Sequence, residues 1–522
     1  MNKNFVISLF FLLGSATLSA QVKLLPIFSD NMVLQQQTQA PIWGESKPNK
    51  KVEITTSWDQ KKYTIQADAQ GKWSTKVATP VAGGPYNITI SDGKKVKLSN
   101  VMIGEVWICS GQSNMEMQVE GWGKVKNYEQ EKEEANNYPN IRFLLVENAM
   151  SPTPVENITA KENGWQVCTS KSVADFSAAG YFFGRDLNRY RNVPIGLIDT
   201  SWGGTIIETW TSNEALSTIP SMKKRLEALV GLPASQEGRK KKFEEDVETW
   251  KAEVERIDKG CVNGKAIWAA PDFNDAAWKF MKVPGLMQEQ DLPGFSGLVW
   301  FRKTIDIPAG WAGKDLILNL GVIDDNDFTY FNGAQIGHTE GWMAPRSYKI
   351  PKELVKKGKA VIAVRVMDTG GINGSPESIS LHLSDTEAIQ LAGNWKYQVS
   401  LDMREVAPMP VDMSWNPNSP TFLFNAMLNP LIPYAIKGAI WYQGESNAGE
   451  AFQYRDLMPL MITDWRNRWG YDFPFYMVQL ASFTAKQTAP VESTWAELRE
   501  AQTRTLHLQN TGMAVAIDIG EE

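Results

Sequence analysis

The residues that could do chemistry begin with a serine at the end of an apolar run. The run VWIC (106–109) leads into SGQSNM (110–115), and the pattern after it favours a helix. A serine in such a turn projects its hydroxyl from the carboxyl end of a strand, where open α/β sheets bind ligands. Its own N–H would lie near the helix N-terminus and could face a developing oxyanion. The spacing indicates Ser113 as a candidate nucleophile, although a glycine-serine turn after a strand is more often only structural.

Two further apolar runs end in groups that acyl transfer uses. The segment LIDTSWGGT (197–205) ends in Gly203 and Gly204, which allow a backbone N–H to approach a substrate oxygen closely. The segment AIWYQGESN (439–447) offers the amide of Gln443 and the carboxylate of Glu445. A nucleophile, a backbone donor and a side-chain donor together predict acyl transfer through a tetrahedral intermediate.

Other chemistries lack their motifs. The chain contains no G-x-S-x-G elbow, no H-E-x-x-H, no Walker A and no G-x-G-x-x-G sequence. Its three cysteines, Cys109, Cys168 and Cys261, are too few and scattered for a disulfide framework or a metal site, and allow one disulfide at most. We expect no metal and no cofactor, because serine acyl transfer needs neither.

The elements that must position these residues are short, continuous apolar runs, typical of parallel strands buried on both faces. They are GEVWICSG, IRFLLV, VPIGLIDTSW, KGAIWYQG, FPFYMVQLA and GMAVAIDIG. Helical patterns separate them, for example at 452–469 and 493–509. The sequence therefore predicts an α/β domain that carries the candidate residues at the carboxyl edge of its sheet.

This domain is flanked and interrupted by β-rich segments. Short alternating runs with glycine and proline turns predict a β-sandwich over 21–100. The α/β domain then covers 101–260, where a charged helical stretch begins at 213, and a second β-sandwich over 261–388 interrupts it. The α/β domain resumes over 389–522.

The motifs SGQSNM, SWGGT and WYQGESN together resemble the SGNH-hydrolase carbohydrate esterases of the sialate O-acetylesterase type, from about residue 22 to the last residue. The resemblance implies a flavodoxin-like, three-layer α/β domain with Ser113 as the nucleophile. It implies oxyanion donors from the N–H of Ser113, from the N–H of Gly203 or Gly204, and from the amide of Gln443. Glu445 would belong to the pocket or to the layer behind it.

The inserted segment is similar to the galactose-binding-like sandwich of glycosidases, through WFR (300–302), YFNG (330–333) and IGH (336–338). The family implies a secreted esterase that removes O-acetyl groups from sialate or other sugars through an acyl-enzyme. An O-acetylated sugar or glycan is therefore the expected partner. The acetyl group needs only a small pocket between Ser113, Gly204 and Gln443. Four indoles are candidates for the rim that contacts the sugar, although a core position is the commoner role for each: Trp122, Trp202, Trp210 and Trp441.

The catalytic base is the unmatched part of the resemblance. The family takes it from an Asp-x-x-His or Asp-x-His segment after the fifth strand, which we place at 512–519. His338 and His382 fall in the inserted β segment, and His507 falls in a helix one strand too early. The base is left open, with His507 as a weak candidate. Three explanations remain: the chain is cut off before its histidine segment, it uses another base, or it is inactive; we expect the first.

Two alternatives stay open beside the esterase. A glycan-binding protein without turnover would explain two β segments, 20 tryptophans and the missing base. A glycosidase would use Glu445 with a second carboxylate, but it would leave the serine and its donors without a role.

The net charge of the chain indicates which partners it can bind, and its first 20 residues indicate where the protein is located. The 522 residues carry 53 Lys and Arg against 59 Asp and Glu, a net charge of −6, which gives no basic excess for nucleic acid or an anionic membrane. A lysine, an apolar stretch and a small-residue end over 1–20 predict a signal peptide, and hence a periplasmic or extracellular protein. No later run is long enough to span a bilayer. The oligomeric state is left open.

Overall fold

The structure, a computed structural model, describes residues 22–373, 378–483, 489 and 491–517. The predicted signal peptide at 1–20 lies outside these residues, as does the end of the strand predicted over 512–519. The chain divides into two compact units, one formed by Met1–Arg239 with Met413–Glu522 and the other by Lys240–Asp412.

The first unit is built on a parallel sheet. Its strands follow the order β24-β23-β22-β7-β10-β8, and every neighbouring pair is parallel. All six predicted apolar runs form these strands, and the α/β prediction is confirmed at this level. The strands are β7 (Lys95–Gly111), β8 (Ile141–Leu145), β10 (Ile195–Ser201), β22 (Gly438–Tyr442), β23 (Phe475–Val478) and β24 (Thr511–Ala514), with β9 (Gln166–Val167) antiparallel to β8.

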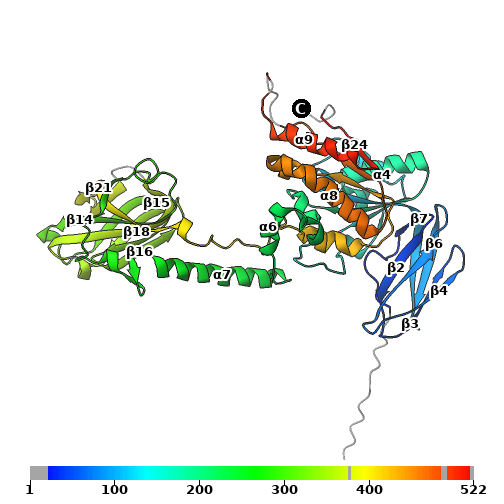
Figure 1. Ribbon diagram of the computed structural model, residues 1–522, viewed down its shortest axis with the longest axis horizontal. Coiled ribbons are helices and arrows are strands. Elements are labelled where there is room, and N and C mark those ends of the chain that lie inside the picture. Colours follow the sequence, from blue (N-terminus) through cyan, green and yellow to red (C-terminus); the bar gives the residue numbers. More distant parts are fainter. Residues whose placement is uncertain (1–21, 374–377, 484–488, 490, 518–522) are drawn as a thin grey trace, which may run out of the picture. The chain divides into compact units, whose positions relative to one another are not determined.

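Helices cover both faces of this sheet because side chains alternate along its strands. Trp107 and Cys109 of β7 pack in one apolar cluster, while Val106 and Ile108 pack in another. Helix α4 (Ala178–Arg191) belongs to the first face, where its Gly180 lies against Cys109. Helices α8 (Ala451–Trp469) and α9 (Thr494–Arg504) belong to the second and lie side by side (Figure 1). Shorter helices connect the strands: α1 (Ser113–Glu116), α2 (Tyr128–Ala135), α3 (Ser170–Ala174), α5 (Asn213–Leu216) and α6 (Lys223–Glu227).

The N-terminal strands join this sheet without a break. β3 pairs with β4 and β6, β6 pairs with the start of β7, and β2 pairs with β5 in a separate two-stranded sheet. Because the 17-residue β7 continues into the parallel sheet, the boundary predicted at residue 100 falls inside one strand. The strands are β1 (Val33–Gln35), β2 (Gln39–Glu45), β3 (Lys51–Thr56), β4 (Lys62–Gln66), β5 (Lys72–Ala78) and β6 (Gly83–Ser91).

The second unit is a β structure larger than predicted. The expected insertion, 261–388, excluded the run 393–402, but this run forms β21, which pairs with both β13 and β14. Its buried Trp395 and Tyr397 belong to the core of this unit, which corrects the predicted boundary at residue 389. The unit contains most of α7 (Gln236–Ile257), and β11 (Cys261–Val262), β12 (Lys265–Ala266), β13 (Lys279–Val283), β14 (Gly297–Ile307), β15 (Leu316–Phe331), β16 (Ala334–Glu340), β17 (Pro345–Ile350), β18 (Gly358–Asn373), β19 (Ile379–His382), β20 (Ala388–Gln390) and β21 (Gly393–Asp402).

Three further observations concern the described residues as a whole. None of their helices combines the length and apolarity needed to cross a bilayer. No cluster of three or more His, Cys, Asp or Glu among them could hold a metal ion. All three cysteines are free, and Cys109 and Cys168 are buried.

Candidate active site

Ser113 begins helix α1 at the carboxyl edge of the sheet, two residues after β7 ends. The intervening Gln112 fixes this turn to the end of β22. Its N–H donates to the Tyr442 carbonyl at 2.9 Å, and its buried Oε1 accepts from the N–H groups of Gly444 and Ser446 at 3.2 and 3.3 Å. Within the part of the chain that the structure describes, neither the N–H nor the Oγ of Ser113 has a hydrogen-bond partner. Ser113 therefore presents a free hydroxyl and a free donor at a fixed position.

The glycine pair lies beside Ser113. A methyl group added at Gly203 would lie 3.5 Å from the Ser113 Cβ. The Gly203 N–H donates to the Glu116 carboxylate at 2.8 Å, so this donor is occupied. The Gly204 backbone has a φ of +73°, and a methyl group there would meet nothing within 4 Å. No partner for the Gly204 N–H exists among the described residues. The open donor of the pair is therefore Gly204.

Gln443 is completely buried and has a full set of partners. Its amide N–H groups donate to the Thr205 carbonyl at 3.0 Å and to Asn447 Oδ1 at 2.7 Å. Its Oε1 accepts from the Tyr454 hydroxyl at 2.8 Å. Gln443 thus ties the loop after β10 to the loop after β22, and a role as oxyanion donor would require it to exchange one of these bonds.

Glu445 places a carboxylate with an unused oxygen in the same loop cluster. Its Oε1 accepts from Asn114 Nδ2 at 2.7 Å, while its Oε2 is buried and has no partner among the described residues. Burial raises the pKa of the Glu445 carboxyl above its usual range. Buried carboxylate oxygens are normally hydrogen bonded, so Oε2 is suited to accept from a group that arrives with substrate or base.

Asp199 lies buried on β10 and accepts from the Ser201 hydroxyl at 2.6 Å. Burial raises the pKa of Asp199 to about 7, and the charge of Glu116 adds to the shift. The folded protein therefore keeps a proton that an unfolded aspartate, with a pKa of about 3.9, loses. Stability is then expected to fall as pH rises from about 4 to about 7 and to level off above that window.

The substitution Asp199→Asn, which cannot ionise, should remove this fall. Thermal unfolding at about pH 5 and about pH 8 tests it, and the melting temperature of the variant should drop less than that of the parent between the two values. Asp456→Asn, on helix α8, is a control for the loss of one carboxylate. Equal drops in parent and Asp199→Asn would contradict the prediction.

The four tryptophans that were predicted as candidates for sugar contact differ in how deeply they are buried. Trp210 and Trp441 have no exposed surface, and their rings pack edge to face with centroids 6.3 Å apart, so the expectation that they contact a sugar is wrong. They are core residues because β22 and the segment after β10 are buried against helix α8. Trp202 is half-buried beside the exposed Trp415, with ring centroids 5.7 Å apart, and Trp122 is 67% exposed.

His507 lies at the wrong edge of the sheet to serve as the base. It precedes β24, whose first residues pair with the first residues of β23, so it lies at the amino edge while Ser113 lies at the carboxyl edge. Its Nδ1 is engaged with the Arg504 carbonyl at 2.7 Å. The weak expectation for His507 is therefore wrong. His338 and His382 belong to the second unit, where they contact the Asp327 carbonyl and Ser380 respectively.

Three residues that were not predicted from the sequence hold the three loops together: Gln112, Asn114 and Glu116. Gln112 and Asn114 lie within the SGQSNM motif, and Glu116 follows it directly. The spacing of Ser113 and Glu116, three residues apart in a helix, could have shown that both face the same side. Nothing in the sequence spacing connects Asn114 with Glu445, because 331 residues separate them.

Comparisons with known proteins show which proteins this chain resembles. The sequence profile of the family described as "Carbohydrate esterase, sialic acid-specific acetylesterase" matches residues 103–257 and 408–522, which include Ser113, the glycine pair, Gln443 and Glu445. The sialate O-acetylesterase of Mus musculus is 23% identical over 94% of this chain and 67% of its own length. That of Homo sapiens is 32% identical over 36% of this chain and 38% of its own length.

One solved structure shares the fold over most of the chain. A carbohydrate acetylesterase from Xanthomonas citri matches 96% of this chain and 69% of its own, with a TM-score of 0.55 and 23% identity. At this identity the likeness concerns the fold.

Proposed function

The chain belongs to the carbohydrate esterase family of sialic acid-specific acetylesterases, and from this premise we propose that it hydrolyses O-acetyl esters of sugars with Ser113 as nucleophile. The observation that carries the proposal is the meeting of Ser113, the glycine pair and Glu445 at one sheet edge, with the Ser113 hydroxyl unengaged among the described residues. We further propose the flavodoxin-like SGNH-hydrolase arrangement for the first unit, a galactose-binding-like sandwich for the second, and export of the protein.

The proposed reaction begins with attack of the Ser113 Oγ on the acetyl carbonyl carbon. The carbonyl oxygen becomes an oxyanion, and the N–H groups of Ser113 and Gly204 stabilise it. These donors are supported by their lack of other partners among the described residues. The bond to the sugar oxygen then breaks, the sugar leaves as an alcohol with a proton, and acetyl-Ser113 remains. Water attacks this ester, releasing acetate and restoring the serine. The base that moves these protons is not assigned.

Glu116 has a positioning role in this proposal. Its carboxylate holds the Gly203 N–H, which sets the loop that carries Gly204 beside Ser113. Glu116→Ala should lower kcat/KM about tenfold because the loop loses its anchor, whereas Glu116→Gln keeps an acceptor oxygen and should retain most of the activity. Steady-state kinetics of both variants test this. Equal losses in the two variants would contradict the positioning role and indicate that the charge itself is needed.

The experiment that tests the proposed function is acetate release from 4-nitrophenyl acetate and from O-acetylated N-acetylneuraminic acid. We expect release from both, and none from N-acetylneuraminic acid without O-acetyl groups, because an amide is a far poorer acyl donor. Binding of the O-acetylated sugar without acetate release would overturn the proposal and favour the glycan-binding alternative.

A further inference from the structure

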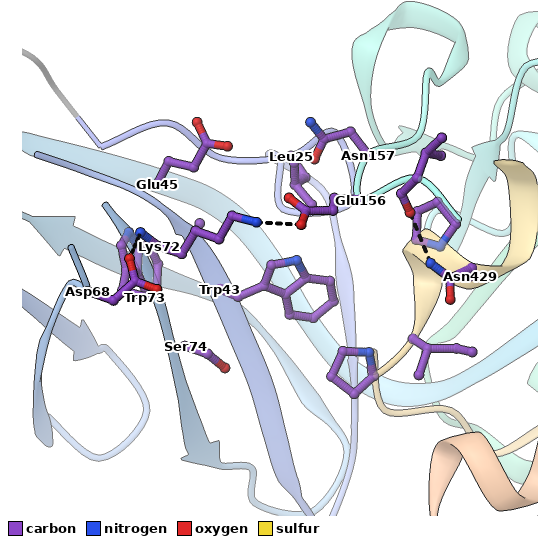
Figure 2. Close-up of a pocket in the computed structure, with 15 residues that line it drawn as sticks. Leu25, Trp43, Glu45, Asp68, Lys72, Trp73, Ser74, Glu156, Asn157 and Asn429 are labelled. Carbon is purple, nitrogen blue, oxygen red and sulfur yellow. Dashed lines mark hydrogen bonds and ion pairs between the residues drawn. The ribbon is translucent and has the colours of Figure 1, made fainter. Parts of the chain in front are cut away.

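A hollow lies in the first unit, and none of the residues of the candidate active site lines it. It has a volume of about 440 Å³ and lies where strands β2 and β5 face the segments 155–157 and 429–433 (Figure 2). Cavities of about 300–1,000 Å³ are typical of small-molecule sites. Both sides of the hollow belong to one compact unit, so the residues that line it keep their positions relative to one another.

The indole of Trp43 lies in the middle of this hollow (Figure 2). It is half-buried, and its ring is held edge-on by Phe28, with centroids 4.5 Å apart, and by Tyr434, with centroids 6.5 Å apart. An aromatic ring fixed in this way offers a flat apolar face at little cost in side-chain entropy. The apolar face of a pyranose ring is complementary in shape to such a surface.

Polar groups surround the indole. Lys72 of β5 donates to Glu156 in an ion pair beside the ring, and both side chains are at least half exposed, so their mutual contact is easily shared with a ligand (Figure 2). Glu45, Asp68 and Asn157 also line the hollow. Three carboxylates against one ammonium give the lining a net negative charge. Such a lining accepts hydrogen bonds from sugar hydroxyls and repels a sugar that carries its own carboxylate.

The wall of the hollow that is formed by residues 155–157 and 429–433 is held by hydrogen bonds. Asn429 Nδ2 donates to the Val155 carbonyl at 3.0 Å, and the Val155 N–H donates to the Asn425 carbonyl at 3.0 Å. In the opposite wall, formed by β2 and β5, Trp73 is 3% exposed, and its indole N–H has no partner among the described residues. Trp43 and Trp73 pack in the same apolar core, so this wall is held in place as well.

We propose that this hollow binds a neutral sugar residue, stacked on Trp43 and hydrogen bonded by Lys72, Glu156 and Asn157. The site would anchor an uncharged part of a glycan while the acetylated part is held elsewhere. It requires no chemistry at Ser113, so it stands or falls separately from the proposed esterase activity.

The test is calorimetric titration of the full chain with neutral methyl glycosides of galactose, glucose, mannose and N-acetylglucosamine, at up to about 10 mM, since one stacked sugar gives affinities near the millimolar range. Methyl glucuronide, which differs from methyl glucoside by its carboxylate and is no product of the proposed reaction, serves as the anionic probe, and arginine serves as the cationic one. We expect at least one neutral glycoside to bind, and the anion to bind at least about tenfold more weakly. Binding of either charged probe alone, or of none, would overturn the proposal.

Variants locate the site. Trp43→Ala should weaken binding of the neutral glycoside about tenfold or more. Trp58→Ala, at a half-buried tryptophan in the turn between β3 and β4 and outside the hollow, should leave binding unchanged. Because Trp43 also packs in the core, Glu156→Ala provides a second variant at an exposed position whose loss scarcely affects folding. Ser113→Ala should bind as the parent does. Unchanged binding in both hollow variants, or loss in Ser113→Ala, would place the sugar elsewhere and overturn the assignment.

Discussion

Replacing Ser113 with alanine is expected to lower the rate of acetate release by about 10³-fold or more, as removal of a catalytic nucleophile typically does. The reason is local: the Ser113 hydroxyl lies beside the glycine pair at the carboxyl edge of the sheet, and it is unengaged within the described part of the chain. Alanine removes the oxygen that is proposed to attack and keeps the backbone N–H that is proposed to face the oxyanion. The measurement is the initial rate of acetate release from O-acetylated N-acetylneuraminic acid.

Ser446→Ala is the matched control for this substitution. Ser446 is an exposed serine in the loop after β22, and its N–H bonds to the same Gln112 side chain that fixes the Ser113 turn. Its hydroxyl has no assigned role, so the variant should retain the parent's rate. A loss of similar size in both variants, or a loss of less than about tenfold in Ser113→Ala, would show that the nucleophile lies elsewhere.

The parallel sheet could be predicted because its strands are buried on both faces. Such strands read as unbroken apolar runs, and each of the six runs forms a strand. The second unit could be predicted as β structure, but the residue at which it ends could not. The run 393–402 alternates as an edge or a core strand would, and only its pairing with β13 and β14 shows that it belongs to the inserted unit. Long-range pairing of this kind has no local signal in one sequence.

The candidate site shows the same division. Ser113 and Gly203 could be placed together because both follow strands of one parallel sheet, and the carboxyl ends of such strands share an edge. Which N–H remains free could not be predicted. It depends on Glu116, which occupies the Gly203 N–H, and on Thr205 and Asn447, which occupy the amide of Gln443.

Burial limited the prediction for the tryptophans as well. Trp202 and Trp210 lie eight residues apart in one segment, yet the first is half-buried at the site and the second is completely buried. The difference arises from the packing of Trp210 against Trp441 and Trp465, which come from β22 and α8. A composition rich in tryptophan indicates neither role by itself.

Replacing Gly111 with alanine is expected to destabilise the first unit by about 3 kcal/mol or more, or to prevent folding. Gly111 is the last residue of β7 and has a φ of +141°, a backbone conformation that L side chains rarely adopt. A methyl group there would lie 2.2 Å from the Tyr442 carbonyl oxygen on the neighbouring strand β22. That same oxygen accepts the Gln112 N–H at 2.9 Å, so relief of the clash would break the bond that fixes the serine turn.

Gly93→Ala separates backbone strain from this clash. Gly93 has a φ of +119°, but a methyl group there would meet nothing within 4 Å, so its substitution should cost only about 1–2 kcal/mol. Urea unfolding midpoints of the two variants measure the difference, together with soluble yield if Gly111→Ala does not fold. Equal midpoints would mean that β7 and β22 can separate at their carboxyl ends without loss. Because Gly111 is both the end of the central strand and the start of the serine turn, a lower midpoint for Gly111→Ala would show that one glycine serves the sheet and the site together.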